Sequence, residues 1–499
     1  MFFYILATVT LIYLFHQLYW KRRNLPPGPL PIPLIGNIQL LAKYEPGYEL
    51  WKDLEKKYGP VFTFWLGNRP MVIVTDYEII KETVIKDGNS YTGRLATGFS
   101  TLLRGGRYGL VEAFGDLWRQ QRRFVLHVLR NFGMGQNLME EKVVEQSRIF
   151  TEMLQKEAIK GPVDLQDHFD AAVGSIINTA LVGYGYNEEN MEEFKRVKNL
   201  LKKHMTITGH PSTFLLYIFP SLRKFPYLKT TFDGVKHTCD SIFDIFSRQK
   251  EEHEKTIDYD DDGYSDYMEA FLKERKKHEN EEDFGGFSLP QLYNACFDLW
   301  MAGMETTSNT LYWGVLYTLT NPHVHKKIVE ELDQVINSTR PVVMSDKPQL
   351  NYINATICEI QRLANVLPMN VARTTNYDVV VGDFKLPADT VIIPQISSIL
   401  YNEELFPDPY CFNPPNFLNE DGSLKKIEQF VPFSVGKRQC PGEGLAKMEL
   451  FLIYANFFNQ FKVSLSPENA NPTIEKKFGS TMKAKNFDVV LEKRINNEM

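Results

Sequence analysis

The first twenty residues, MFFYILATVTLIYLFHQLYW, are almost all apolar and carry no formal charge, and Lys21, Arg22 and Arg23 follow at once. A helix of this length spans about 30 Å, the thickness of the hydrocarbon core of a bilayer. The basic cluster favours a cytoplasmic location for the chain that follows it. A cleaved signal peptide is the alternative, but it would have a basic start, a shorter apolar core and a small-residue cleavage site. We therefore expect residues 1–20 to be a single-pass transmembrane anchor in a lipid bilayer.

Prolines and short apolar runs divide the rest of the chain. Residues 21–37 combine the basic stop-transfer cluster with five prolines, which exclude a helix and favour a stiff extended hinge. The runs VFTFWLG and PMVIVTD, on either side of residues 67–70, predict a β-hairpin. Helical patterns dominate residues 112–320, and strand-like runs return at 378–394. Since no repeat or second boundary interrupts the chain after residue 37, the pattern predicts one mainly α domain with small β-sheets over 38–499.

Composition narrows the functional classes. Of 499 residues, 43% are hydrophobic and 24% charged, so the chain can bury a large core. The net charge of -6 gives no general argument for binding nucleic acid, and we expect none. The five cysteines are scattered and odd in number, which is typical of a reducing compartment rather than of a disulfide framework.

One cysteine stands in a conspicuous setting, FVPFSVGKRQCPGEGLAKMEL. Pro441 suits the first position of a helix, so Cys440 would lie at a helix N-terminus, where backbone N–H groups stabilise a thiolate. A thiolate is a strong ligand for iron, including haem iron. Gly436 and Gly442 would let a flat partner approach the backbone, and Arg438 suits a carboxylate such as a haem propionate. The alternative is a buried structural cysteine in a turn.

The loop from Phe433 to Gly442 resembles the F-x-x-G-x-R-x-C-x-G loop of the cytochrome P450 haem-thiolate monooxygenases. The resemblance implies the cytochrome P450 fold and a haem-containing catalytic domain over residues 38–499. It assigns haem b as the cofactor and Cys440 as the axial ligand of its iron. It also places Phe433, Gly436, Arg438 and Gly442 at the haem.

A second motif lies in a long apolar stretch, residues 288–322, that predicts a buried helix crossing the domain. Gly303 costs such a helix about 1 kcal/mol relative to alanine, and a flat cofactor against the helix would explain it. The hydroxyl of Thr306 is expected to bond back to the carbonyl of Ala302. The sequence AGMETT resembles the family's A-G-x-D/E-T-T motif, which implies that Ala302 and Gly303 adjoin the haem, that Thr306 acts in oxygen activation and that Glu305 serves proton delivery. An ordinary core helix with a satisfied polar pair is the alternative.

Glu359 and Arg362 lie at i, i+3 on a predicted helix over residues 354–368, among apolar neighbours that indicate at least partial burial. The pair is similar to the family's structural E-x-x-R. Most members complete this network with an arginine from a later segment, where this chain has Asn416. That departure leaves the third partner of the network open.

Further basic residues are candidates for the haem propionates. Trp118 and Arg122, one helical turn apart in LWRQQRRF, could clasp a carboxylate, or could belong to an amphipathic basic helix. They resemble the family's W-x-x-x-R segment. By the same resemblance Arg373 is a propionate ligand and Arg94 is a weaker candidate. With Arg438 these arginines exceed the two charges of the propionates, so one of them could have a packing or solvent-facing role.

The resemblance is to the microsomal branch that metabolises drugs and lipids. It implies NADPH-dependent insertion of one oxygen atom into a lipophilic xenobiotic, fatty acid or other lipid, at the endoplasmic reticulum membrane with the catalytic body facing the cytosol. Because the chain shows no flavin or nicotinamide motif, electrons would come from a separate flavoprotein reductase, with cytochrome b5 as a second candidate donor. The exposed charges Arg119, Arg123 and Lys437 could dock the reductase or simply be solvated. Alternatives are a haem-thiolate isomerase or peroxygenase and a non-enzymatic haem sensor.

The substrate is the least determined feature. Several residues suggest an apolar cavity with a basic residue at its mouth, although plain core packing explains each of them equally. These candidates for the substrate pocket are Arg107, Phe114, Phe297, Met301, Leu367 and Met482.

Overall fold

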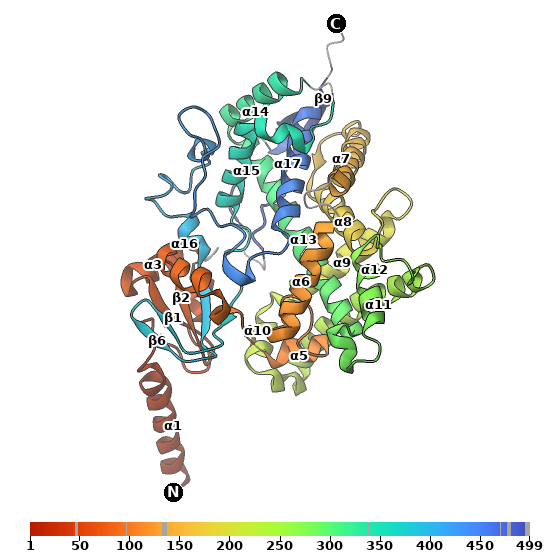
Figure 1. Ribbon diagram of the computed structural model, residues 1–499. Coiled ribbons are helices and arrows are strands. Elements are labelled where there is room, and N and C mark those ends of the chain that lie inside the picture. The colour runs from red at the N-terminus through yellow and green to blue at the C-terminus, as the bar shows by residue number, and fades with distance from the viewer. Residues whose placement is uncertain are drawn as a thin grey trace.

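The computed structural model describes residues 1–44, 48–95, 97–131, 137–337, 340–469, 471–476 and 481–494. Helix α1 (Phe2–Leu18) projects away from a β-rich lobe, and a larger helical lobe lies beside that lobe (Figure 1). The long helices of the body are α3 (Tyr48–Tyr58), α6 (Gly115–Asn131), α7 (Asn137–Ala158), α8 (Gln166–Val182), α9 (Met191–Thr208), α11 (Pro226–Glu254), α12 (Tyr267–Lys277), α13 (Leu289–Leu319), α14 (Pro322–Val335), α15 (Asn351–Ala364) and α17 (Glu443–Gln460). The short helices are α2 (Ile38–Lys43), α4 (Tyr77–Ile80), α5 (Gly98–Arg104), α10 (Pro211–Ile218) and α16 (Ile396–Leu400).

Helix α13 is the central element of the helical lobe (Figure 1). It contacts α8, α11, α14, α15 and α17, which accounts for its apolar sequence on most sides. Its 31 residues lie within the predicted span of 288–322, and Pro322 opens the next helix instead of extending this one. The prediction of a buried helix crossing the domain is therefore confirmed.

The predicted hairpin is confirmed as β1 (Val61–Leu66) and β2 (Arg69–Val74), which pair antiparallel with Trp65 opposite Pro70. Strand β7 (Val391–Pro394) joins β2 in parallel, and β4 (Arg373–Thr374) completes a sheet of order β1-β2-β7-β4. This sheet holds the backbone of Arg373 in place. The remaining strands form two small sheets, β3 (Val163–Asp164) with β9 (Asp488–Lys493) and β8 (Phe461–Leu465), and β5 (Val379–Val381) with β6 (Phe384–Leu386).

The N-terminal helix has no buried residue, and it is long and apolar enough to cross a membrane. The proline segment after it is not helical, as predicted. It is attached to the sheet, however, because Thr63 donates its backbone N–H to Pro27 O and its hydroxyl to Pro26 O, both at 2.8 Å. The segment therefore forms part of the β-rich lobe as well as a spacer.

Candidate active site

Cys440 lies in the loop before α17, which begins at Glu443 with Gly442 as its N-cap, two residues later than Pro441 predicted. The loop is closed by hydrogen bonds from Cys440 N to Phe433 O and from Gln439 N to Gly436 O, both 3.0 Å. The Cys440 side chain is exposed, although dense protein surrounds it. Burial raises the pKa of the Cys440 thiol, and the backbone N–H groups of Gly442 and Glu443 oppose that rise. The expected helix-end stabilisation is thus present but outweighed, and a metal cation at the sulfur would be needed to favour the thiolate.

Gly436 and Gly303 both lie tightly against other parts of the chain. A Cβ on Gly436, whose φ is +71°, would lie 2.2 Å from Val84 O, and a Cβ on Gly303 would lie 2.6 Å from Cδ1 of Ile177 on α8. Close packing within the protein therefore requires both glycines, and their expected place beside a flat cofactor stays a prediction. A Cβ on Gly442 would meet only the Cys440 sulfur, at 3.9 Å, so this position does leave space.

The motif on α13 presents its residues in two directions. Ala302 is exposed and Thr306 half-buried, although both lie in the middle of the central helix. The Thr306 hydroxyl donates to Ala302 O at 2.7 Å, which confirms the predicted back-bond. Glu305 is buried and accepts from Lys483 Nζ at 2.6 Å and from the Thr481 hydroxyl at 2.9 Å. The acid is therefore tied to the C-terminal segment 481–494, a partnership that no local sequence pattern indicated.

Four buried or half-buried arginines converge near the Cys440 loop and donate to backbone carbonyl oxygens. Arg438 donates to Thr92 O at 2.9 Å and to Ala113 O at 2.6 Å. Arg94 donates to Val111 O at 3.0 Å and to Ala372 O at 2.8 Å. Each guanidinium therefore has a fixed position without an ionic partner of its own.

The other two arginines adjoin the cysteine loop directly. Arg373 donates to Val435 O at 2.7 Å and to the Ser434 hydroxyl at 3.0 Å. Arg122 donates to Gln439 O at 2.6 Å. The ring centre of Trp118 lies 3.9 Å from the Arg438 guanidinium, which it supports by a cation–π contact. That Trp118 and Arg122 together hold a carboxylate stays a prediction.

Among the described residues no acid forms an ion pair with the cluster of Arg94, Arg122, Arg373 and Arg438, although Glu112 partly opposes the effect of burial on the pKa of Arg94. Within the part of the chain that the structure describes, no carboxylate oxygen lies within 4 Å of any of the four guanidinium groups. Burial, followed by repulsion between the arginines, lowers the pKa of Arg373 to about 9 and that of Arg438 to about 7. Burial likewise lowers the pKa of Arg94 to about 10. A bound dianion such as the pair of haem propionates fits this cluster.

Glu359 and Arg362, unlike the arginine cluster, neutralise each other's charge. Both are fully buried and paired twice, with Nε–Oε2 at 2.7 Å and a second contact of 2.8 Å. Arg362 also donates to the carbonyl oxygens of residues 400, 409 and 411. Glu359 accepts from Asn413 N at 2.9 Å and from the amide of Asn416 at 3.4 Å. Asn416 thus takes the third place in the network, which the sequence analysis left open.

The candidate pocket residues separate into two groups. Phe114 and Leu367 are exposed and Met301 is half-buried, whereas Phe297 and Met482 are almost fully buried. Met482 donates its backbone N–H to Val366 O and accepts from the indole of Trp313 at its carbonyl, so its backbone is fixed and its side chain is buried. The Arg107 guanidinium lies 3.6 Å from the centre of the Phe114 ring and donates to Arg94 O at 2.9 Å. Arg107 is therefore engaged within its loop.

The sequence analysis missed a clamp between α13 and the loop before α6. Asp298, almost fully buried, accepts from the backbone N–H groups of Leu110 and Val111 at 2.8 Å and pairs with Arg104 at 2.6 Å. Gln291 bonds both the N–H and the carbonyl of Gly109. An acid and an amide among the apolar residues of the first half of α13 were the available signal, but neither indicates which loop it holds.

Comparison with known proteins decides the family. The family model described as Cytochrome P450 matches residues 26–491. The chain belongs to the cytochrome P450 family. Membership implies haem b with its iron, and the chain is a P450 monooxygenase. The open sulfur of Cys440 and the unbalanced arginine cluster both fit this cofactor.

The similarity to three named relatives covers most of this P450 and most of each relative. Cytochrome P450 2H2 of Gallus gallus is 35% identical over 451 residues, which are 90% of this chain and 88% of that protein. Cytochrome P450 2C4 of Oryctolagus cuniculus is 35% identical over 452 residues, 89% of this chain and 90% of that protein. Cytochrome P450 2A9 of Mesocricetus auratus is 34% identical over 477 residues, 94% of this chain and 93% of that protein. The exposed apolar helix α1 fits a membrane anchor for such a P450.

Proposed function

We propose that this P450 inserts one atom of O2 into a lipophilic small molecule, with Cys440 as the axial ligand of the haem iron and electrons from NADPH delivered by a separate flavoprotein reductase. The other oxygen atom leaves as water. When bound, the haem supplies oxygen activation, which a thiolate ligand promotes by donating electron density. The observation that carries the proposal is the exposed Cys440 sulfur beside buried arginines that have no acid of their own.

The arginines would hold the haem carboxylates. Arg373 and Arg438 are the best placed, because both are buried, fixed by backbone carbonyls and destabilised by their neighbours' charge. A carboxylate beside them would remove that destabilisation and gain charge-assisted hydrogen bonds. Arg122 would add a third donor at the Cys440 loop. Arg94 donates to Val111 O and Ala372 O and would hold these two loops together rather than bind the haem.

Thr306 and Glu305 would deliver protons to the reacting centre. The Thr306 hydroxyl already donates to Ala302 O, so its lone pairs remain free to accept a proton donor such as water at the reacting centre. Glu305 is buried but is paired with Lys483, whose side chain is 47% exposed. This pair would connect the region of Thr306 to solvent and replace each proton that is used.

The substrate would contact exposed apolar groups near α13. Phe114 and Leu367 expose more than a third of their surface, and Met301 can adapt to different shapes because its side chain is flexible. Phe297 would form the wall behind them, while Met482 is assigned to packing. These surfaces fit a xenobiotic, a fatty acid or another lipid.

Electron entry would use the face that lies against the cysteine loop. A cavity of about 250 Å³ there is lined by residues 430–436 and by Gln439, Glu443 and Lys447. Arg123 and Lys437 are exposed, whereas Arg119 is already paired with Asp116. An acidic surface of the reductase, or of cytochrome b5 as a second donor, would fit these two cations, which form no ion pair within the described residues.

The location follows from the N-terminus. Residues 1–20 would span the endoplasmic reticulum membrane once, residues 21–37 would stop transfer and form the hinge, and residues 38–499 would be the haem domain facing the cytosol. The three basic residues after the anchor support this orientation.

A reconstitution experiment tests the mechanism. Product should form only with NADPH and reductase, and Thr306→Ala should consume NADPH while yielding little product. The matched control is Thr310→Ala, because Thr310 makes the same back-bond one turn further along α13. Product without an electron donor would favour a peroxygenase or isomerase, equal coupling in Thr306→Ala would reject the role of Thr306, and haem binding without any turnover would favour a sensor.

A further inference from the structure

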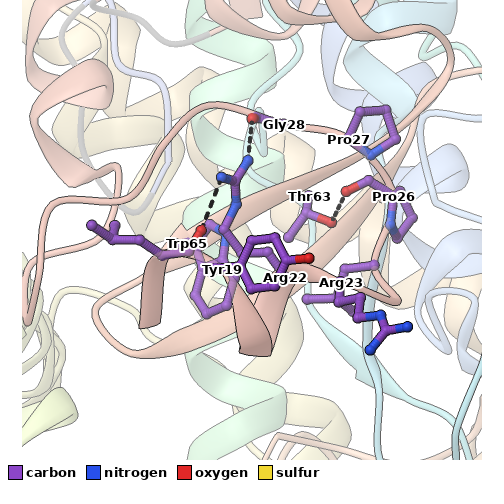
Figure 2. A pocket seen from close by; sticks show the side chains of 10 residues that line it. Tyr19, Arg22, Arg23, Pro26, Pro27, Gly28, Thr63 and Trp65 are labelled. Atoms are coloured by element: carbon purple, nitrogen blue, oxygen red, sulfur yellow. Dashed lines mark hydrogen bonds between the residues drawn. The ribbon is translucent and has the colours of Figure 1, made fainter. Parts of the chain in front are cut away.

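A cavity of about 230 Å³ lies where α1 meets the β-rich lobe. Figure 2 shows Arg22 pointing toward Gly28, with Trp65 and Tyr19 on one side of it and Pro26, Pro27 and Arg23 on the other. The cavity is far in sequence from the Cys440 loop and shares none of the site residues described above. Neither the arginine cluster nor the substrate pocket accounts for it.

The walls of this cavity are fixed by hydrogen bonds. Thr63 holds Pro26 and Pro27 against β1, as Figure 2 shows for the bond to Pro26. A Cβ on Gly28 would lie 2.0 Å from Thr63 O, so only glycine lets the chain pass this close to the strand. Arg22 then donates to Gly28 O at 3.2 Å and to Leu18 O at 3.4 Å. The cavity is therefore preformed.

Its basic residues have no acidic partner. Lys21 Nζ donates to Asn68 O at 2.5 Å and lies 5.4 Å from the centre of the Trp65 ring. Arg23 is exposed and lies 5.8 Å from the centre of the Trp20 ring. Across the described ranges, no carboxylate oxygen lies within 4 Å of Lys21, Arg22 or Arg23. Two arginines thus line the cavity, Lys21 adds a third positive charge beside its Trp65 wall, and no acid is among the lining residues.

The position of the cavity identifies the source of the missing charge. Leu18, the last residue of α1, lies at its edge, so the cavity begins where the apolar helix ends. Tyr19 and Trp20 expose 58% and 57% of their surface there, and such rings favour the headgroup level of a bilayer. If α1 spans the hydrocarbon core, the cavity lies at the depth of the lipid phosphates.

We propose that this cavity binds the headgroup phosphate of an anionic glycerophospholipid, with Arg22 and Arg23 as hydrogen-bond donors and Lys21 as additional positive charge. The inference rests on the proposed membrane anchor. Arg22 also caps the carbonyl end of α1 through Leu18 O, but a capping role explains neither Arg23 nor the cavity. The site would fix the angle between the anchor and the body, because the same lipid contacts both.

The test uses the full-length holoenzyme in detergent with equal amounts of phosphatidylserine and phosphatidylcholine. Native mass spectrometry should show preferential retention of phosphatidylserine, and Arg23→Gln should reduce that preference roughly fivefold, the effect of one basic residue near an anionic surface. Lys21→Gln combined with Arg23→Gln should abolish it. Arg130→Gln, which removes an exposed arginine at the end of α6, should retain it. Equal retention of both lipids by the wild type, or an unchanged preference in the double variant, would overturn the proposal.

Two further arms separate this site from the anchor and from a free anion. Wild type and double variant should both sediment with vesicles of pure phosphatidylcholine, because α1 alone drives insertion. A wild type that stayed in solution would overturn the anchor and the lipid site with it, whereas normal sedimentation without phosphatidylserine preference would overturn only the site. Displacement of phosphatidylserine by an equal concentration of inorganic phosphate would show a free-anion site and overturn the lipid assignment.

Discussion

Two buried groups of charges in this protein behave in opposite ways. Glu359 and Arg362 are both fully buried, and every strong partner they need comes from the chain itself. The arginine cluster of residues 94, 122, 373 and 438 is also largely buried, but its charges face carbonyls, an aromatic ring and one another. The first group is complete as folded, whereas the second is balanced only when something negative is added.

The difference teaches how to separate a structural charge from a binding charge. A buried ion pair with saturated hydrogen bonds can be entirely internal, and its value lies in what its loss would leave unpaired. Buried cations without an acid destabilise the chain that contains them, so their presence indicates a ligand that compensates. For this P450 we propose that the ligand is the pair of carboxylates on haem b.

The largest expected effect comes from breaking the complete group. Arg362→Leu should cost about 3–5 kcal/mol of the free energy of unfolding, because it leaves the Glu359 carboxylate buried and unpaired. Thermal unfolding of the purified holoenzyme measures it. The double variant Glu359→Leu with Arg362→Leu removes both charges and should recover part of the loss. A single variant as stable as the wild type would show that the pair is dispensable and would remove the basis of the comparison.

Removing an arginine from the cluster should weaken haem binding in the haem-bound protein but stabilise the haem-free protein. Arg373→Leu should release haem to an acceptor protein about 10–100-fold faster, because charge-assisted hydrogen bonds contribute about 1.5–3 kcal/mol. The same substitution should raise the unfolding midpoint of the haem-free protein, since it removes a repelled buried cation. Arg119→Leu, on the surface, should change neither quantity. Equal destabilisation of both forms would mean that Arg373 is structural.

A single buried acid, Glu449, extends the comparison to a buried charge of the opposite sign, and we expect a smaller effect from its substitution. Glu449 on α17 is almost fully buried, and its Oε1 has no partner within the described residues. Burial raises the pKa of Glu449 well above its usual value, so the folded protein keeps it neutral. In the unfolded protein the Glu449 carboxyl can ionise, which stabilises the unfolded state. The free energy of unfolding therefore falls as the pH rises from the unfolded pKa of Glu449 toward its folded pKa.

Glu449→Gln should therefore raise the unfolding midpoint at pH 8 more than at pH 6. The glutamine keeps the shape and the hydrogen bond to Thr307 but cannot ionise. Calorimetry of both proteins across this range measures the change, with Glu443→Gln at the half-buried N-terminus of α17 as the control. A gain that is the same at all pH values would mean that Glu449 does not titrate with folding.

Much of the fold was predictable because its signals are local. The apolar run of α13, the strand–turn–strand of residues 61–74 and the anchor each follow from neighbours along the chain. The order of residues around Cys440 likewise predicted a loop that presents a sulfur and a nearby guanidinium.

What could not be predicted depends on contacts distant in sequence. Gly303 is required by Ile177 of another helix, and Glu305 is held by Lys483 near the C-terminus. Asn416 completes the network of Glu359 only because its loop returns to α15. The pKa of Cys440 depends on the protein that surrounds its exposed sulfur, and this effect outweighs the local effect of the helix end.

The most direct test is the carbon monoxide difference spectrum of the reduced protein, recorded for wild type, Cys440→Ser and Cys411→Ser. Cys411 is exposed like Cys440, but it lies in the loop that accepts from Arg362. We predict the red-shifted band of thiolate-ligated haem in the wild type and in Cys411→Ser, and its loss in Cys440→Ser. A wild-type spectrum without that band, or its survival in Cys440→Ser, would contradict the account.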